Sequence, residues 1–488
     1  MKYTKYQTLL GRIDKHFEGF IDQSTYKVTY IKPSKLITFN RLDLAIKILY
    51  LRMRDYIDVH FAAELYEKHI KAFSLGSFTE PGKPKKNSIQ HYFNDFQAIY
   101  KSISIDGFKE AKSVIPLSSS GSIANGAHRL ASAYEMKKVV PSVSLNMPDD
   151  NYDFNFFLQR GMSIKDVETA VTSFIEFADN CYVALIWPSA KGNKEEVDNL
   201  IPNIVYQKSV ALNNLGAHNL LTQVYFDEDW LGSREDKYPG VKDKLVECFK
   251  TFDDLRVVAF QSNSLEEVLL IKEHIREIFS IGKHSVHITD TKDEAIRTAR
   301  ILFNENSIHF LNYGNPTKFL SVHQKIERFK KFIEKNDIDI DKTVLDSSIV
   351  MSLYGIRESN DIDYLSVDED VKYHDELIDN HVEELVFHQE SKNSLIFNQA
   401  LHFYYDGLKF ISFSQLYNMK KNRSEKKDQN DLVLMKSLIE HNLMRMCIGK
   451  CKQEYYFFTV KLRIKVMKLL KHIGLYKTIR YIYRVFKK

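Results

Sequence analysis

The chain has 488 residues, 44% of them hydrophobic and 12% aromatic, with a formal net charge of +5. This composition excludes a disordered protein, and the length exceeds what one ordinary hydrophobic core can serve. Only four cysteines, no apolar leader and no apolar run long enough to span a bilayer exclude a disulfide framework, a signal peptide and a spanning helix, so we expect a cytoplasmic protein.

The sequence changes character several times along its length. Its alternating helical and strand patterns predict an α/β and α+β multidomain fold. We expect an amino-terminal domain over residues 1–150, a central domain over 165–320, a third domain over 321–445 and a basic tail over 446–488.

The amino-terminal part predicts helices over residues 41–73 and 92–103, separated by a polar loop over 80–87. A strand, a glycine turn at Gly126 and a helix that opens with His128 and Arg129 come next. A helix start attracts anions through its free N–H groups and dipole, and an arginine adds a fork of donors. Phosphate binding is therefore one interpretation; simple capping and solvation of the helix is the other.

This stretch, Ser122-Ile123-Ala124-Asn125-Gly126-Ala127-His128-Arg129, resembles the glycine–X–His–Arg turn of the ParB/sulfiredoxin-like fold, over about residues 92–143. The resemblance implies that Gly126, His128 and Arg129 bind the phosphates of ATP or CTP. Members of that group include DNA-segregation proteins, sulfiredoxins and small-molecule kinases. Glu80, in the polar loop, is a candidate base for phosphoryl transfer.

The central part predicts strands over 181–187, 255–260, 285–289 and 307–311. Helices over 264–279 and 291–303 lie between them, each opened by a capping-box pattern at Ser264 and Thr291. Strands that alternate with helices predict a parallel, Rossmann-like α/β domain. No glycine-rich dinucleotide fingerprint occurs there, which speaks against a nicotinamide site and leaves a transferase or substrate-binding domain.

The third part carries two aspartates, Asp361 and Asp363, in a predicted strand. Side chains repeat every two residues along a strand, so both carboxylates point the same way and can reach one Mg²⁺. Ser347 and Ser348 precede a short helix and offer hydroxyl and N–H groups to a phosphate. We predict catalytic and metal-binding roles for the aspartates and nucleotide binding for the serines.

A small-residue turn followed by two carboxylates one residue apart resembles the minimal nucleotidyltransferase superfamily, over about residues 340–440. The resemblance implies that Mg²⁺ on Asp361 and Asp363 positions the triphosphate. Two features depart from the pattern: Asp346 stands where a glycine usually opens the turn, and no third carboxylate is evident, since Asp406 falls in a probable hairpin turn. An inactive, structural strand end is the alternative.

The tail has no acidic residue after Glu454, and it places Leu462, Val466, Leu469, Leu470 and Ile473 on one helical face among lysines and arginines. A second amphipathic piece is predicted after Gly474. A basic amphipathic helix favours an anionic membrane surface. Nucleic acid, the less favoured partner, and another helix are the alternatives.

Together these features resemble multidomain proteins of bacterial surface-polysaccharide biosynthesis. The leading hypothesis is a Mg²⁺-dependent transferase, of nucleotidyl or kinase type, that uses ATP or CTP and a sugar or phosphorylated small molecule. It would sit on the inner face of the cytoplasmic membrane. A ParB-like, CTP-binding regulator or defence factor on DNA is a second hypothesis, and a non-catalytic scaffold with degenerate nucleotide folds is a third.

Overall fold

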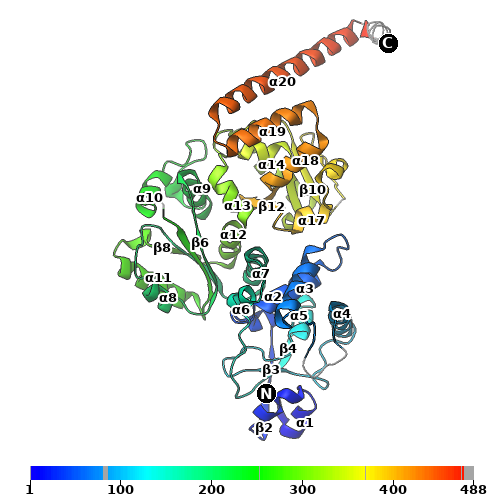
Figure 1. The fold of residues 1–488 in the computed structure, drawn as a ribbon, viewed down its shortest axis with the longest axis vertical. Coiled ribbons are helices and arrows are strands. Elements are labelled where there is room, and N and C mark those ends of the chain that lie inside the picture. The colour runs from blue at the N-terminus through cyan, green and yellow to red at the C-terminus, as the bar shows by residue number, and fades with distance from the viewer. Residues whose placement is uncertain (1, 81–85, 252, 369, 474, 477–488) are drawn as a thin grey trace.

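The computed structural model describes residues 2–80, 86–251, 253–368, 370–473 and 475–476. Three sheets follow one another along an elongated molecule, with the amino terminus at one end and a long helix projecting from the other (Figure 1). The mixed α/β character expected from the sequence is confirmed.

The amino-terminal sheet has the strand order β1-β2-β4-β3, in which only β3 and β4 are parallel. The helix predicted over 41–73 is two helices, broken between Arg54 and His60. The elements are β1 (Lys2–Lys5), α1 (Tyr6–Leu10), η1 (Lys15–Phe20), β2 (Thr25–Ile31), η2 (Pro33–Leu36), α2 (Leu42–Met53), α3 (Phe61–Phe73), α4 (Ile89–Asp106), β3 (Ile115–Leu117), α5 (Ala127–Glu135) and β4 (Val140–Ser144).

Two helices, α6 (Phe154–Gln159) and α7 (Ile164–Phe177), connect this part to the central sheet. One face of α7 is deeply buried, because Val167, Val171 and Phe174 have no exposed surface. These side chains belong to a single apolar cluster that continues from α2 and α3 to one face of the central sheet. The amino-terminal and central parts therefore share a core.

The central sheet has the strand order β6-β7-β5-β8, and all of its neighbouring strands are antiparallel. Helices α8 and α11 pack on the same face. The order of elements and strands is that of the split β-α-β motif. The elements are β5 (Cys181–Ile186), α8 (Lys194–Leu200), β6 (Ile204–Val210), α9 (Asn214–Val224), η3 (Asp229–Leu231), α10 (Val241–Cys248), β7 (Leu255–Gln261), α11 (Leu265–Phe279), η4 (Gly282–His284), β8 (Val286–Ile288) and α12 (Lys292–Leu302).

The predicted parallel, Rossmann-like sheet is therefore wrong. Helix α8 connects β5 to β6, and α11 connects β7 to β8. The two strands of each pair run in the same direction, but an antiparallel strand lies between them in the sheet. The strand predicted over 307–311 is also wrong, because these residues belong to helix α13 (Glu305–Tyr313). Asn304 caps this helix by accepting from the N–H of Ser307. A short apolar run fits a buried strand and a buried helix equally well, so periodicity alone could not decide.

The carboxy-terminal sheet has the strand order β11-β10-β9-β13-β12. Strand β10 is antiparallel to β9 and parallel to β11, while β13 is parallel to β9. The elements are α14 (Ser321–Asn336), η5 (Ile340–Lys342), β9 (Thr343–Asp346), α15 (Ser348–Leu353), β10 (Ile362–Ser366), β11 (Ile378–Asn380), η6 (Val382–Glu384), α16 (Leu385–His388), α17 (Lys392–Phe397), β12 (His402–Tyr405), β13 (Leu408–Ile411), α18 (Phe413–Arg423) and α19 (Lys426–Ile439).

Helix α20 (Leu443–His472) begins against α19 and then extends away from the body of the molecule (Figure 1). Leu462, Val466, Leu469 and Ile473 are each about half exposed, with exposed fractions of 50%, 46%, 60% and 51%. No helix in the described ranges is long and apolar enough to cross a membrane. The second amphipathic piece, predicted after Gly474, falls largely outside the described residues.

Candidate functional site

The two predicted metal ligands lie at the end of the carboxy-terminal sheet where β9 finishes and β10 begins. Asp363 is paired with Asp346 across the antiparallel β9 and β10, so the two side chains project to the same face. Asp361 is exposed, and the hydroxyl of Ser348 donates to its Oδ1 at 3.2 Å. The structure thus brings Asp361, Asp363, Ser347 and Ser348 together, as the sequence predicted.

The carboxyl of Asp363 is kept in an unfavourable electrostatic position. Burial raises its pKa to about 6, and the nearby charges of Asp361 and Asp346 act in the same direction. The charge of His381 and a hydrogen bond from Ser347 act in the opposite direction, but burial outweighs them. Two adjacent carboxylates provide the hard oxygen ligands that Mg²⁺ prefers.

Asp346 has a different environment, which the sequence did not predict. Its side chain is fully buried, and its Oδ2 accepts from His381 Nδ1 at 2.7 Å and from His388 Nε2 at 2.9 Å. Burial opposes its charge, but His388 and His381 outweigh burial and hold the pKa of Asp346 well below its usual range. The extra carboxylate is therefore compensated by two histidines rather than left facing a phosphate.

Asp346, His381 and His388 are also residue types that bind zinc, and their donor atoms lie within 4.8 Å of one another. However, both imidazoles already direct a ring nitrogen at one oxygen of Asp346. Gln415 completes the arrangement by donating to the carbonyl of His388 at 2.8 Å. The hydrogen bonds satisfy this cluster without an ion, so the Asp361–Asp363 pair fits a metal better.

The positive φ of the turn falls at Ser347, with φ 61° and ψ −126°, and not at Asp346. A side chain in this region is strained. The N–H of Ser347 points inward to Asp346 Oδ1 at 2.6 Å, and its side chain hydrogen-bonds to Asp363. The two serines predicted to cradle phosphate therefore hold the carboxylates in this structure.

We expect Ser347→Gly to stabilise the fold by about 1 kcal/mol, because glycine adopts a positive φ without steric strain. Urea unfolding measures the change. Ser348→Gly is the control, since Ser348 begins helix α15 without a positive φ and glycine there should lose the hydrogen bond to Asp361. Equal destabilisation by both variants would contradict the strain argument.

The raised pKa of Asp363 predicts pH-dependent metal binding. A folded-state pKa above that of an unfolded aspartate means that the charged form destabilises the metal-free fold above about pH 6. Mg²⁺ should relieve this repulsion, and protons should compete with it below about pH 6, by about tenfold in affinity per pH unit. Mg²⁺-induced shifts in Tm at about pH 5 and pH 7.5 test this, with Asp363→Asn as the control that removes the dependence.

Asp379 is a further residue that the sequence did not single out. It is exposed on β11 and lies directly opposite Asp363 in the parallel register. Neighbouring strands are about 4.8 Å apart, so Asp379 brings a third carboxylate to this edge.

The earlier candidate, Asp406, is in the β12–β13 hairpin turn beside Gly407, and it pairs with Arg234 at 3.1 Å. The hairpin was predicted correctly, and Asp406 lies away from the metal pair.

The second predicted site, at the start of α5, is only partly assembled. Gly126 has φ 92°, and a Cβ there would come within 2.5 Å of Ile115, so the turn requires glycine. Arg129 lies over this turn and lines a hollow of about 310 Å³ with Lys109 and Lys112, and burial lowers its pKa. A basic hollow of this kind is compatible with an anion.

His128 does not line that hollow. Its Nε2 hydrogen-bonds to the hydroxyl of Tyr66 at 2.8 Å, and its ring packs on Phe96 with centroids 4.5 Å apart. Burial holds the pKa of His128 well below its usual range, so it is neutral. Glu80 forms an ion pair with Lys86 at 2.7 Å. Burial raises the pKa of Tyr66, and the charge of Glu80 acts in the same direction.

Comparison of the chain with family models, with curated proteins and with solved structures finds no match.

Proposed function

We propose that this protein is a Mg²⁺-dependent nucleotidyl or phosphoryl transferase, with its reaction centre at Asp361 and Asp363. The observation that carries the proposal is the pair of adjacent carboxylates, one exposed and one with its pKa raised by burial to about 6, at the end of β9 and β10. The resemblance of residues 340–440 to the minimal nucleotidyltransferase superfamily supports the same chemistry.

In this proposal the chain's own groups have separate tasks. Asp361 and Asp363 would hold Mg²⁺, which would supply positive charge to the triphosphate of ATP or CTP. Ser348 orients Asp361 through its hydroxyl, and the Asp346–His381 pair fixes the floor of the site. Arg129, in the basic hollow beside α5, binds a second nucleotide or phosphorylated molecule.

The experiment is a transfer assay on the full chain with each α-labelled and γ-labelled nucleoside triphosphate, hexose phosphates as acceptors, and Mg²⁺ or EDTA. Label should move only with Mg²⁺, and Asp361→Asn should lower the rate at least about 100-fold. Asp368→Asn is the matched control, because Asp368 lies beyond the other end of β10 and its carboxylate is 4.0 Å from Lys342. Transfer that survives Asp361→Asn would overturn the assignment, and a flat response to every nucleotide would favour a scaffold.

The proposed setting is bacterial surface-polysaccharide assembly at the inner face of the cytoplasmic membrane. Helix α20 supports it, because Phe458, Leu462, Val466, Leu469 and Ile473 form an exposed apolar stripe at helical spacing. Lysines at 461, 465, 468 and 471 lie along one flank of this stripe and behind it. An anionic lipid surface binds both parts of such a helix, since its acyl chains take up the apolar stripe and its headgroups attract the lysines.

Flotation of the full chain with phosphatidylglycerol vesicles tests this setting. The double variant Leu462→Asn/Leu469→Asn should no longer float with the vesicles. The double variant Ile464→Asn/Met467→Asn should still float with them. Ile464 and Met467 are also exposed, at 43% and 37%, but they lie outside the stripe. Equal flotation of both double variants would exclude a membrane role for the stripe.

A further inference from the structure

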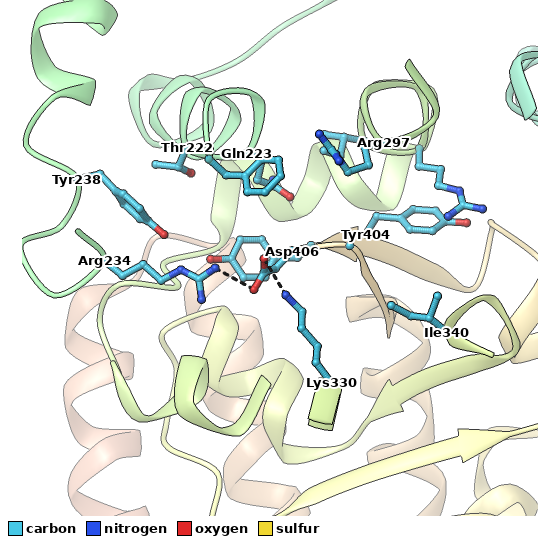
Figure 2. Close-up of a pocket in the computed structure, with 14 residues that line it drawn as sticks. Thr222, Gln223, Arg234, Tyr238, Arg297, Lys330, Ile340, Tyr404 and Asp406 are labelled. Atoms are coloured by element: carbon cyan, nitrogen blue, oxygen red, sulfur yellow. Dashed lines mark hydrogen bonds and ion pairs between the residues drawn. The ribbon is translucent and has the colours of Figure 1, made fainter. Parts of the chain in front are cut away.

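A separate cavity lies between the central and carboxy-terminal sheets, and no role has been assigned to it so far. It has a volume of about 310 Å³ and is lined from α9, α12, α14, the loop after η3 and the β12–β13 hairpin (Figure 2). This volume is at the lower end of the range for small-molecule pockets, which begins at about 300 Å³. The space suits one ring and its substituents rather than a dinucleotide.

Four cations line this cavity, and three of them are already neutralised. Arg234 and Lys330 both reach Asp406, at 3.1 and 3.2 Å, as Figure 2 shows. Arg300 is paired with Asp341 at 2.9 Å. These pairs hold the walls of the cavity together, and a ligand would gain little from competing with them.

Arg297, on α12, is the exception. Its guanidinium lies over the ring of Phe226, with 4.6 Å between the guanidinium carbon and the ring centroid, and it has no salt bridge among the described residues. The cation–π contact leaves the N–H groups of Arg297 available for a charged acceptor. Arg297 therefore supplies the uncompensated positive charge of this cavity.

Gln223, on α9, lies on the same wall as Arg297 (Figure 2). Its Nε2 is buried and has no hydrogen-bond partner within the described part of the chain. A buried donor without an acceptor is destabilising by about 1–3 kcal/mol unless a ligand supplies the acceptor. Gln223 and Arg297 thus provide two independent indications of a bound acceptor group.

Four aromatic side chains also line the cavity, together with Thr222, Ile301 and Ile340. Tyr238, Tyr404 and Tyr405 form the walls with Phe226, which is 44% exposed. Aromatic faces pack on sugar or aromatic rings and exclude water from polar contacts beside them. The lining therefore favours a ligand with a ring as well as an anionic group.

The cavity is distinct from the Asp361–Asp363 site. Strands β9 and β13 are parallel, with Leu345 opposite Phe410. Asp346, at the carboxyl end of β9, therefore lies toward Ile411, whereas the Asp406–Gly407 turn precedes β13 and lies at the other end of the sheet. The two sites face opposite ends of the same strands.

We propose that this cavity binds a phosphate monoester carried on a single ring, such as a monosaccharide phosphate. The phosphate lies on Arg297 and Gln223, and the ring packs among Phe226, Tyr238 and Tyr404. This inference does not rest on the proposed transferase function, because it uses neither the metal pair nor a nucleotide.

The test is isothermal titration calorimetry of the full chain in EDTA with four probes: glucose 1-phosphate, phenyl phosphate, inorganic phosphate and glucose. We expect at least one ring phosphate to bind more tightly than inorganic phosphate, and glucose not to bind. The two ring phosphates distinguish a pyranose from an aromatic ring. Arg297→Gln should raise the Kd by about tenfold or more.

Arg160→Gln is the matched control, because Arg160 also stacks on a phenylalanine, at 4.2 Å over Phe156, but in a different part of the chain. It should bind as the unchanged protein does. Asp361→Asn should also retain binding, so failure of the transferase proposal and failure of this one give different results. Arg297→Lys, which keeps the charge but loses the fork, should give an intermediate Kd if Arg297→Gln does not fold.

The inference is overturned if neither ring phosphate binds, or if Arg297→Gln binds them as tightly as the unchanged protein. It is also overturned if inorganic phosphate binds as tightly as both ring phosphates, since the ring would then contribute nothing.

Discussion

Replacing Asp346 by alanine should lower the free energy of unfolding by about 3–5 kcal/mol at pH 6. The carboxylate is fully buried and accepts from two imidazoles, of which His388 is also fully buried. Without Asp346 these ring nitrogens lose their acceptor in a site that water does not reach. Urea unfolding monitored by circular dichroism measures the effect.

The effect of Asp346→Ala should depend on pH in a defined direction. Burial opposes protonation of His381, but its hydrogen bond to Asp346 and the charge of that carboxylate raise its pKa above the usual value. The His381 contribution is therefore fully present below the unfolded pKa of about 6.5 and is lost as the pH rises through the folded value. The destabilisation by Asp346→Ala should be smaller at about pH 9 than at pH 6.

Asp368→Ala is the control for Asp346→Ala, because its nearest cation is 4.0 Å away and both side chains are well exposed. It should change stability by no more than about 0.5 kcal/mol. A loss at Asp346 no larger than this would show that the histidine pair does not stabilise the fold.

Replacing Asp431 by alanine should also cost about 3–5 kcal/mol. Its buried carboxylate accepts two hydrogen bonds from Arg357, at 2.8 and 2.9 Å, and pairs with Lys420 at 2.9 Å. Gln453 of α20 donates to it at 2.7 Å. The single side chain of Asp431 therefore connects α18, α19, α20 and the loop after α15.

Hydrogen exchange should show where the structure opens in the Asp431→Ala variant. Amides of α20 between Leu443 and Phe457 should exchange faster, because Gln453 and the cations lose their common acceptor. Glu440→Ala is the matched control, since Glu440 is paired with Arg445 at 3.0 Å on the surface and should cost less than about 1 kcal/mol. Unchanged exchange in α20 would contradict the role of Asp431 as its anchor.

Local patterns in the sequence predicted local structure well. Ser264 and Thr291 are the N-caps of α11 and α12, as the capping-box patterns indicated. The carboxylate half of both boxes differs, because Glu267 accepts from the N–H of Asn263 and Glu294 from the N–H of Asp290, each one residue before the N-cap. Caps and hairpin turns involve only a few consecutive residues, so their chemistry can be read from the sequence.

The candidate metal pair was also a local prediction. Asp361 and Asp363 are two residues apart at the start of β10, and the serine turn lies just before them in the chain. His381 and His388 were missed because they follow β11, far from Asp346 in sequence. The cavity lined by Arg297 was missed for the same reason, since its walls come from six separate segments.

The sequence by itself determined helices α11 and α12, strands β5, β7 and β8, the short turns and the pair Asp361 and Asp363, because periodicity, caps and alternation act within a few residues. Only the tertiary structure decided that the central sheet is antiparallel, that residues 307–311 are helical and that two histidines surround Asp346. Strand direction and side-chain partners depend on which distant segments share a core, and the free energy of that choice is spread over the whole packed interior.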